Sequence, residues 1–229
     1  RALWKGKAVG NLELQVPGHH NLLNAAGVLA TGLNLGFGAA ELLTGLATFR
    51  GTGRRFEVVG TVHGVRVIDD YGHHPSELAA TLQTARSLNP KRLVVLFQPH
   101  RYTRTQALAD DFGKVLQAAD LVFISDVYAA SETPIPGVSG QTLVDAMARH
   151  GKVPAKFLPR LDKAHYVVGN ALQPGDLLIT LGAGNVHEVG TRIARDLKTL
   201  EEIKALAPSG GIDGKLYEPM GRQTTLLVG

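Results

Sequence analysis

The amino-acid sequence predicts an α/β fold: a doubly wound, mostly parallel, Rossmann-like sheet, preceded by a small helical part. Three observations support this prediction. Strand and helix patterns alternate from about Phe56 to about Leu200, as in repeated βα units. The expected strands, such as Arg92–Phe97, are short and almost continuously apolar, which is typical of parallel strands covered on both faces. The apolar pair Val67-Ile68 leads into polar residues and then Pro75, the pattern of a strand, a loop and the first turn of a helix.

The first 50 residues carry a different pattern. Gly10–Val16 alternates apolar and polar residues, which predicts a half-buried strand. His19–Ala30 is rich in small residues and predicts a helix, and Ala39–Phe49 predicts a second, shorter helix. The glycine- and arginine-rich stretch Arg50–Arg55 follows, and we expect it to be a hinge between two domains.

Beyond this hinge the expected elements follow in a regular order. Phe56–Thr61 and Val65–Ile68 flank His63-Gly64, a tight-turn signal that predicts a hairpin. Further strands are expected at Arg92–Phe97, Leu121–Ile124, Ala155–Phe157 and Leu177–Thr180, and helices at Glu77–Leu88, Thr105–Ala118, Gln141–His150, Leu161–Leu172 and His187–Leu206. Together they predict one doubly wound domain.

Composition narrows the possible functions. The chain has 229 residues, of which 44% are hydrophobic and 19% charged, as in ordinary globular proteins. It has no cysteine, which excludes disulfides, thiolate–zinc sites and thiol nucleophiles and fits a cytoplasmic protein. No apolar run is long enough to cross a bilayer, and no signal peptide is recognisable. The net charge of +4 comes from scattered basic residues, which is compatible with anionic small molecules and is a weak signal for nucleic acid.

If the strands are parallel, four loops share the edge of the sheet where ligands bind in such folds. They are residues 69–74, 98–105, 125–137 and 182–186. The second loop carries His100, Arg101 and Arg104 at the start of a predicted helix. Two guanidinium groups beside a helix N-terminus make an anion site. Ion pairs with Asp110 or Asp111 are the alternative, but they would leave His100 without a role, so we favour the anion site.

The first of these loops, Asp69-Asp70-Tyr71-Gly72-His73-His74, concentrates the most titratable chemistry in the chain. One interpretation is structural: one carboxylate orients one imidazole. A second is a divalent metal site, as in a metal-dependent phosphoesterase, which would need further ligands such as His100 or Asp126. A third is a substrate site, in which a carboxylate holds a ribose hydroxyl while Tyr71 and His73 face an acceptor. We rank the third interpretation first.

Two asparagines near the start of the first predicted helix are a further candidate. Asn21 and Asn24 lie three residues apart and therefore on one helical face. Two side-chain amides there could recognise the edge of a base. Asn21 could instead be only the helix N-cap, and taken alone the pattern favours that simpler interpretation.

Several of these motifs together resemble the Mur ligases, the ATP-dependent amide-forming enzymes of peptidoglycan synthesis. The motifs are Gly18-His19-His20-Asn21-Leu22-Leu23-Asn24-Ala25, Arg54-Arg55-Phe56, Asp69-Asp70-Tyr71-Gly72-His73-His74-Pro75, His100-Arg101-Tyr102-Thr103-Arg104 and Gly182-Ala183-Gly184-Asn185. The family member that adds a whole tripeptide usually has Phe-Ala where this chain has Tyr71-Gly72, and it lacks the His-Arg-Tyr-Thr-Arg motif. The resemblance therefore favours the member that joins L-alanine to UDP-N-acetylmuramate.

The resemblance also implies roles for individual residues. The ATP site would consist of His20, Asn21, Asn24, Arg55 and Asp70, with the asparagines on adenine, Asp70 on the ribose and Arg55 near the phosphates. Tyr71, His73, Arg101 and Arg104 would bind the substrates, and His73, His100, Arg101 and Arg104 would act in catalysis, with no metal ligand among them. ATP would convert the lactyl carboxylate into an acyl phosphate, which the amine of alanine attacks.

The same resemblance predicts a divided chain that is a fragment of a longer protein. Residues 1–50 would end a central ATP-binding domain, 51–200 would form the C-terminal domain, and 201–215 would be a linker. Residues 216–229 resemble the start of the flavin-dependent UDP-N-acetylenolpyruvoylglucosamine reductases, so we expect a ligase–reductase fusion with FAD only in the downstream part. No Gly-Lys-Thr/Ser phosphate loop occurs; that loop and the Mg2+ ligands are expected upstream. We therefore expect no ligase activity from this chain alone, and we expect no partner of nucleic acid or membrane.

Overall fold

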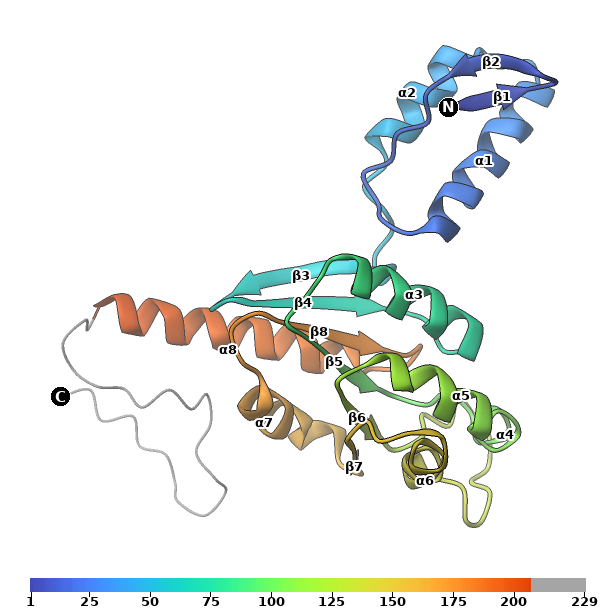
Figure 1. Ribbon diagram of the computed structural model, residues 1–229. Coiled ribbons are helices and arrows are strands. Elements are labelled where there is room, and N and C mark those ends of the chain that lie inside the picture. The colour runs from blue at the N-terminus through green and yellow to red at the C-terminus, as the bar shows by residue number, and fades with distance from the viewer. Residues whose placement is uncertain (207–229) are drawn as a thin grey trace.

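The computed structural model describes residues 1–206 of the chain, and it has two parts (Figure 1). A small N-terminal lobe lies beside a larger α/β domain, with the start of helix α1 (His19–Asn34) near helix α3 (Pro75–Ser87), and the segment around residues 49–56 joins the two parts. The reductase-like stretch 216–229 and the predicted linker from residue 207 onward lie outside the described residues. Within residues 1–206, no helix combines the length and the apolar character needed to cross a membrane.

The lobe is a short hairpin and two helices. Strands β1 (Ala2–Trp4) and β2 (Lys7–Gly10) pair antiparallel, and helices α1 (His19–Asn34) and α2 (Ala39–Thr48) follow. Both helices were predicted, and α1 runs four residues further than expected. The predicted strand Gly10–Val16 is wrong: β2 ends at Gly10, and Leu14 and Val16 line a pocket instead. Apolar and polar residues alternate in this segment because its apolar side chains line a cavity, and not because the segment pairs with another strand.

The α/β domain is built on a six-stranded sheet in the order β3-β4-β8-β5-β6-β7. The strands are β3 (Glu57–Val62), β4 (Val65–Asp70), β5 (Arg92–Phe97), β6 (Leu121–Ser125), β7 (Ala155–Leu158) and β8 (Asp176–Leu181). Strand β3 pairs antiparallel with β4 in the predicted hairpin, and all the other pairings are parallel. This confirms the predicted α/β class and its mostly parallel sheet.

Helices cover both faces of this sheet, so there are two cores (Figure 1). The helices are α3 (Pro75–Ser87), α4 (Tyr102–Ala107), α5 (Ala109–Val115), α6 (Gly140–His150), α7 (Leu161–Ala171) and α8 (His187–Leu206), with a 3₁₀ turn η1 (Leu116–Ala118). One core joins Phe97 of β5 to α3, α5 and α6, and the other joins Phe123 of β6 to α7 and α8. Burial of two continuous apolar layers is the main stabilising term of such a domain.

Two expected helix boundaries need correction. The helix predicted over Thr105–Ala118 starts at Tyr102 and breaks at Leu108, whose backbone is not helical. The break lets Leu108 pack against the core while Phe112 is fully buried in it. At the other end, α8 continues to Leu206, so the expected start of the linker at residue 201 is helical; no glycine or proline occurs between Gly190 and Pro208 to end the helix earlier.

Candidate active site

The four loops predicted to share one edge do meet at the carboxyl ends of β4, β5, β6 and β8, because these strands run parallel. The loop after β4 is organised by Asp70, whose side chain is buried. Its Oδ2 accepts a hydrogen bond from the backbone N–H of Phe56 at 2.8 Å. Its Oδ1 accepts from the N–H of Gly72 at 2.8 Å and from the Thr81 hydroxyl at 3.2 Å. Asp70 thus ties the inter-domain segment, its own loop and α3 together.

Burial raises the pKa of Asp70, although these three hydrogen bonds oppose the rise. The residue that follows in the loop must be small. A Cβ on Gly72 would lie 2.8 Å from Asp70 Oδ1, closer than a carbon and a carboxylate oxygen can approach. Glycine at this position lets the backbone N–H reach the carboxylate.

Helix α3 has Pro75 in its first turn, as the sequence predicted, and His74 as its N-cap, so it begins two residues before the expected Glu77. Glu77 closes the capping box: its Oε2 accepts from the backbone N–H of His73 at 2.9 Å and of His74 at 3.1 Å. Burial would raise the pKa of Glu77, but these hydrogen bonds and the charges of His73 and Arg55 outweigh it, and the pKa is lowered. Glu77 is therefore ionised at neutral pH.

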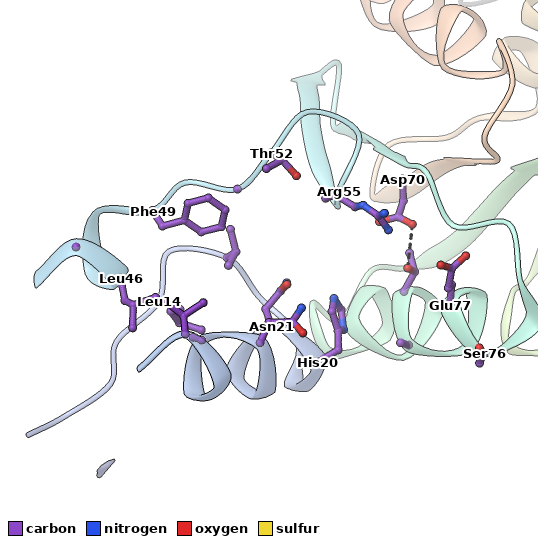
Figure 2. A pocket seen from close by; sticks show the side chains of 18 residues that line it. Leu14, His20, Asn21, Leu46, Phe49, Thr52, Arg55, Asp70, Ser76 and Glu77 are labelled. Carbon is purple, nitrogen blue, oxygen red and sulfur yellow. Dashed lines mark hydrogen bonds between the residues drawn. The ribbon is translucent and has the colours of Figure 1, made fainter. Parts of the chain in front are cut away.

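A pocket of about 800 Å³ lies between the lobe and this loop–helix junction (Figure 2). All five residues predicted to form a nucleotide site line it: His20, Asn21, Asn24, Arg55 and Asp70. Ser76, Glu77 and Thr81 add polar groups, and Leu14, Val16, Leu46 and Phe49 add apolar surface. One wall thus comes from α1 and α2 and the other from β4 and α3.

Asn21 is not the helix cap. The N-cap of α1 is Gly18, and the Asn21 amide donates instead to the carbonyl of Pro17 at 2.7 Å. One amide N–H of Asn21 is thereby engaged, while its carbonyl oxygen and second N–H are available at the pocket. The capping interpretation, which the sequence alone favoured, is wrong for this residue.

Aromatic rings from three strand ends form a second group, here called the rim: Tyr71, His73, His100 and Tyr128. Their ring centroids are spaced 5.5 Å for Tyr71–His73, 5.4 Å for His73–His100 and 5.6 Å for His100–Tyr128. The backbone fixes the last contact, because Arg101 N–H donates to the Tyr128 carbonyl and Tyr128 N–H donates to that of Pro99, both at 2.8 Å.

The two arginines of the loop after β5 flank this rim. Arg104 Nη1 lies 3.4 Å from His100 Nδ1, and Arg101 forms the N-cap of α4. Burial lowers the pKa of His100, and the charges of His73, Arg104 and Arg101 lower it further. The alternative pairing with Asp110 or Asp111 is wrong among the described residues: both acids contact Lys114, and Asp110 also contacts Arg149 and His150.

The rim and the pocket are neighbours, not one cavity. Asp70 lines the pocket, whereas His73, His100, Arg101 and Arg104 lie beyond it along the same edge. Glu77 connects the two, since it lines the pocket and its Oε2 is 3.7 Å from His73 Nδ1. The edge of the sheet thus carries two adjoining subsites, the pocket with Asp70 and the rim with the two arginines.

Residues 54–184 match the protein family described as "Mur ligase, glutamate ligase domain". The chain belongs to the Mur ligase family. It is 48% identical over 191 residues to a UDP-N-acetylmuramate–L-alanine ligase of Oleidesulfovibrio alaskensis, covering 83% of this chain and 42% of that protein. It is 50% identical over 183 residues to the ligase of the same name from Acidithiobacillus ferrooxidans, covering 80% of this chain and 39% of that protein. The chain thus spans about two fifths of the length of these curated relatives.

Solved structures show the same similarity. The UDP-N-acetylmuramate–alanine ligase of Thermotoga maritima superimposes with a TM-score of 0.68 at 32% identity, covering 85% of this chain and 40% of that one. A murein peptide ligase of Psychrobacter arcticus superimposes with a TM-score of 0.62 at 22% identity, covering 82% and 38%. At that identity the second likeness concerns the fold alone.

Three residues of this Mur ligase site were missed by the sequence analysis: Glu77, Tyr128 and Arg54. Arg54 Nε lies 3.1 Å from Asp69 Oδ2, its Nη2 donates to the Gly182 carbonyl at 2.5 Å, and its guanidinium lies 4.9 Å from the centre of the Tyr71 ring. It thereby fastens the inter-domain segment to two strand ends. In the sequence it appears within the motif Arg54-Arg55-Phe56, but only Arg55 of that motif received a role.

The described residues give no support to the interpretation of the Asp-Asp/His-His loop as the metal site of a phosphoesterase. Within the described part of the Mur ligase chain, no group of three or more His, Asp or Glu side chains could hold a metal ion. Asp69 is occupied by Arg54 and by the Thr180 hydroxyl, and Asp70 by its loop. The carboxylates of the Asp-Asp pair therefore organise the edge of the sheet rather than ligate a cation.

Proposed function

We propose that this chain is the C-terminal domain, with the end of the ATP-binding domain, of a ligase that joins L-alanine to the lactyl carboxylate of UDP-N-acetylmuramate. The domain boundary at residues 50/51 is part of this proposal. The curated relatives that carry this name are 44–50% identical to the chain. The observation that supports the proposal best is the pocket, in which five residues from three separate sequence motifs line one cavity.

The pocket is the proposed site for the nucleoside end of ATP. Its volume of about 800 Å³ falls in the range of small-molecule sites, roughly 300–1,000 Å³. Asn21 and Asn24 offer amide donors and acceptors to adenine, with His20 beside them. Asp70 Oδ2 accepts one protein hydrogen bond and retains acceptor capacity for a ribose hydroxyl. Arg55 would contact phosphate oxygens.

The rim is the proposed site of the acyl transfer. Arg101 and Arg104 place positive charge beside Tyr71, His73 and His100, which suits the carboxylate of alanine and the charge that develops on the acyl group. ATP phosphorylates the lactyl carboxylate, the amine attacks the acyl phosphate, and phosphate leaves. Because the rim adjoins the pocket through Glu77, the two halves of the reaction occur side by side.

Mg2+ is expected in this reaction, where it neutralises charge on the transferring phosphoryl group. The described residues offer no cluster of ligands for it. Its ligands, like the phosphate loop, are therefore assigned to the part of the ligase that precedes these motifs.

An exchange experiment tests the proposal. This chain replaces the matching part of the Oleidesulfovibrio alaskensis ligase, and phosphate release is measured with ATP, UDP-N-acetylmuramate and L-alanine. The hybrid should release phosphate only when all three are present, and the Arg101→Ala/Arg104→Ala variant should not. A folded hybrid that binds ATP and UDP-N-acetylmuramate but releases no phosphate would contradict the proposal. The chain alone should release none.

Calorimetry on the isolated chain separates the two rival functions. ATP should bind weakly, and Asn24→Ala or Arg55→Ala should abolish its binding. Micromolar binding of Mn2+ without nucleotide would favour the phosphoesterase. UDP-N-acetylmuramate binding that is indifferent to Arg101→Ala and Arg104→Ala would favour a non-catalytic nucleotide-binding module.

The fusion to a reductase is a separate part of the proposal. It depends on residues 216–229, among them Thr224-Thr225-Leu226 and Val228-Gly229, which resemble the first strand of the flavin-dependent reductases. The sequence that adjoins Gly229 in the parent gene tests it: a flavin-binding domain there would support the fusion, and an unrelated sequence would refute it.

A further inference from the structure

The two rim histidines face one another but have different neighbours at Nδ1. Their ring centroids are 5.4 Å apart with an angle of 48° between the ring planes. His73 follows β4 and His100 follows β5. Because a neutral imidazole carries its proton on one nitrogen only, the partner of Nδ1 decides what Nε2 can do.

At His73, the partners of Nδ1 are acceptors. The Tyr71 carbonyl oxygen lies 3.1 Å from His73 Nδ1, and the Glu77 carboxylate lies 3.7 Å from the same atom. Neither group can donate a hydrogen bond, since Glu77 is ionised. The proton of the neutral ring therefore resides on Nδ1, and Nε2 carries the free lone pair.

At His100, the partner of Nδ1 is a donor. Arg104 Nη1 lies 3.4 Å from His100 Nδ1, and a guanidinium has no acceptor to offer. The same Nη1 lies 3.4 Å from the His100 carbonyl oxygen. A proton on Nδ1 of His100 would point at this cation, so the arrangement favours a lone pair on Nδ1 and the ring proton on Nε2. Burial and the neighbouring positive charges, which lower the pKa of His100, favour a neutral ring over a doubly protonated one.

We propose that the two imidazoles are opposite tautomers with opposite tasks: His73 Nε2 is the base that takes a proton from the amine of the incoming amino acid, and His100 Nε2–H donates a hydrogen bond to an oxygen of the reacting acyl group. This rests on the proposed ligase function and assigns the proton transfer within it. The His73 side chain is 23% exposed, so a substrate can reach it.

The charges around the two rings fit this division. Glu77 faces His73 and stabilises the imidazolium that forms when Nε2 is protonated, as an acid orients and supports a catalytic histidine elsewhere. Arg104 and Arg101 lie on the side of His100 and oppose its protonation, while Glu132 acts weakly in the other direction. The negatively charged Glu77 thus lies beside His73, the proposed base, and the two arginines lie on the side of His100, the proposed hydrogen-bond donor.

The proton balance of the step is complete with one such base. The ammonium group loses one proton to His73 Nε2, and the amine lone pair then forms the C–N bond to the acyl carbon. The C–O bond to phosphate breaks, and the phosphate leaves with that electron pair and takes the second nitrogen-bound proton. His73 returns its proton to solvent.

Nitrogen NMR on the chain itself tests the tautomers without substrate. With 15N-labelled histidine, long-range proton–nitrogen spectra at neutral pH distinguish Nδ1–H from Nε2–H rings, and His73→Asn and His100→Gln identify the two signals. The expected result is Nδ1–H for His73 and Nε2–H for His100. The same tautomer on both rings, reversed tautomers, or a doubly protonated His100 would overturn the proposal.

Kinetics of the hybrid ligase test the roles. His73→Asn keeps an N–H toward the Tyr71 carbonyl but removes the base, so kcat should fall by about 10²–10⁴-fold at neutral pH and recover at alkaline pH, where the amine is already deprotonated. His100→Gln places an N–H near the former Nε2 and should keep most of kcat. His63→Asn, in the remote turn of the β3–β4 hairpin, is the control and should leave kcat unchanged.

The reverse ranking of the two variants, or a His73→Asn defect that alkaline pH does not relieve, would overturn the assignment. Failure of the ligase proposal looks different: the unmodified hybrid would then be inactive, and the role in amine deprotonation would fall with it. The tautomers measured in the isolated chain would still show whether the two rings are set oppositely.

Discussion

The two walls of the pocket belong to regions that are built very differently. The lobe buries few apolar side chains: Ala25 and Leu29 are buried in α1, whereas Leu23, Leu35 and Phe37 are 58–71% exposed. The α/β domain has two extensive cores. The asparagine wall therefore belongs to a unit with little buried apolar surface, and the Asp70 wall belongs to a well-packed domain. The two walls of one pocket thus differ in the amount of buried apolar core that supports them.

The largest effect is expected when a buried leucine is replaced by alanine, once in the α/β domain and once in the lobe. Leu96→Ala removes a fully buried side chain from β5 and should lower the free energy of unfolding of the α/β domain by about 2–5 kcal/mol. Leu29→Ala in α1 should destabilise the lobe alone. The single tryptophan, Trp4, lies in β1, so its fluorescence reports on the lobe while far-UV circular dichroism reports mainly on the domain. If fluorescence and circular dichroism gave the same urea midpoint in each of the two variants, the lobe and the domain would unfold together, and the difference between the two regions would be refuted.

The next effect concerns the connection between the regions. Arg54→Ala leaves the 4%-exposed Asp69 side chain without its ion pair and should cost about 2–3 kcal/mol of stability, toward the low end for a broken buried pair. Because Arg55 follows directly, ATP binding should weaken as well. Arg160→Ala is the matched control, since Arg160 pairs with Asp162 on the exposed surface, and it should change neither quantity. If Arg54→Ala and Arg160→Ala had equal urea midpoints, the contacts of Arg54 would not stabilise the connection between the two regions.

Much of this fold could be predicted because its signals are local. The apolar runs of β5 and β8 and the turn at His63-Gly64 marked strands correctly. The position of β8 between β4 and β5 could not be predicted, since crossover connections leave the order of parallel strands open. The helix break at Leu108 could not be predicted either, because no glycine or proline marks it; it depends on the packing of Phe112 in the core.

The site shows the same limit. His73, His100 and Arg104 were visible as polar residues at predicted strand ends. The role of Arg54 could not be predicted, although the residue stands in a family motif, because its partners Asp69 and Gly182 are 15 and 128 residues away in the chain. Glu77 was hidden for another reason: a glutamate at the third position of a helix is expected for capping alone, and its contact with His73 is visible only in the fold.

A smaller effect is expected within the α/β domain, at the residues that support the rim. A Cβ on Gly184 would meet the Tyr128 ring at 2.7 Å and the buried Gln98 side chain. Gly184→Ala should therefore push Tyr128 away from His100, at a cost of about 1–2 kcal/mol. Alanine-dependent turnover of the hybrid should fall while ATP binding stays unchanged. Gly137→Ala is the control, because nothing lies near its added Cβ, and only its positive φ would cost stability. Loss of ATP binding in Gly184→Ala would show that the rim and the pocket do not act separately.

The smallest effect lies on the outer surface of the same domain. Asp110 accepts a 2.7 Å hydrogen bond from His150, joining α5 to α6, and this bond together with Lys114 lowers the pKa of Asp110 to about 2. A pKa that is lowered in the folded state stabilises the protein above the unfolded value and loses that contribution as the pH falls toward the folded value. Asp110→Asn should therefore lower Tm slightly at pH 7, and the difference from the unmodified chain should shrink between about pH 4 and pH 2. An undiminished difference at pH 2 would show that the side chain acts through packing, and Asp145→Asn, which leaves this pair intact, should not reproduce the pH dependence.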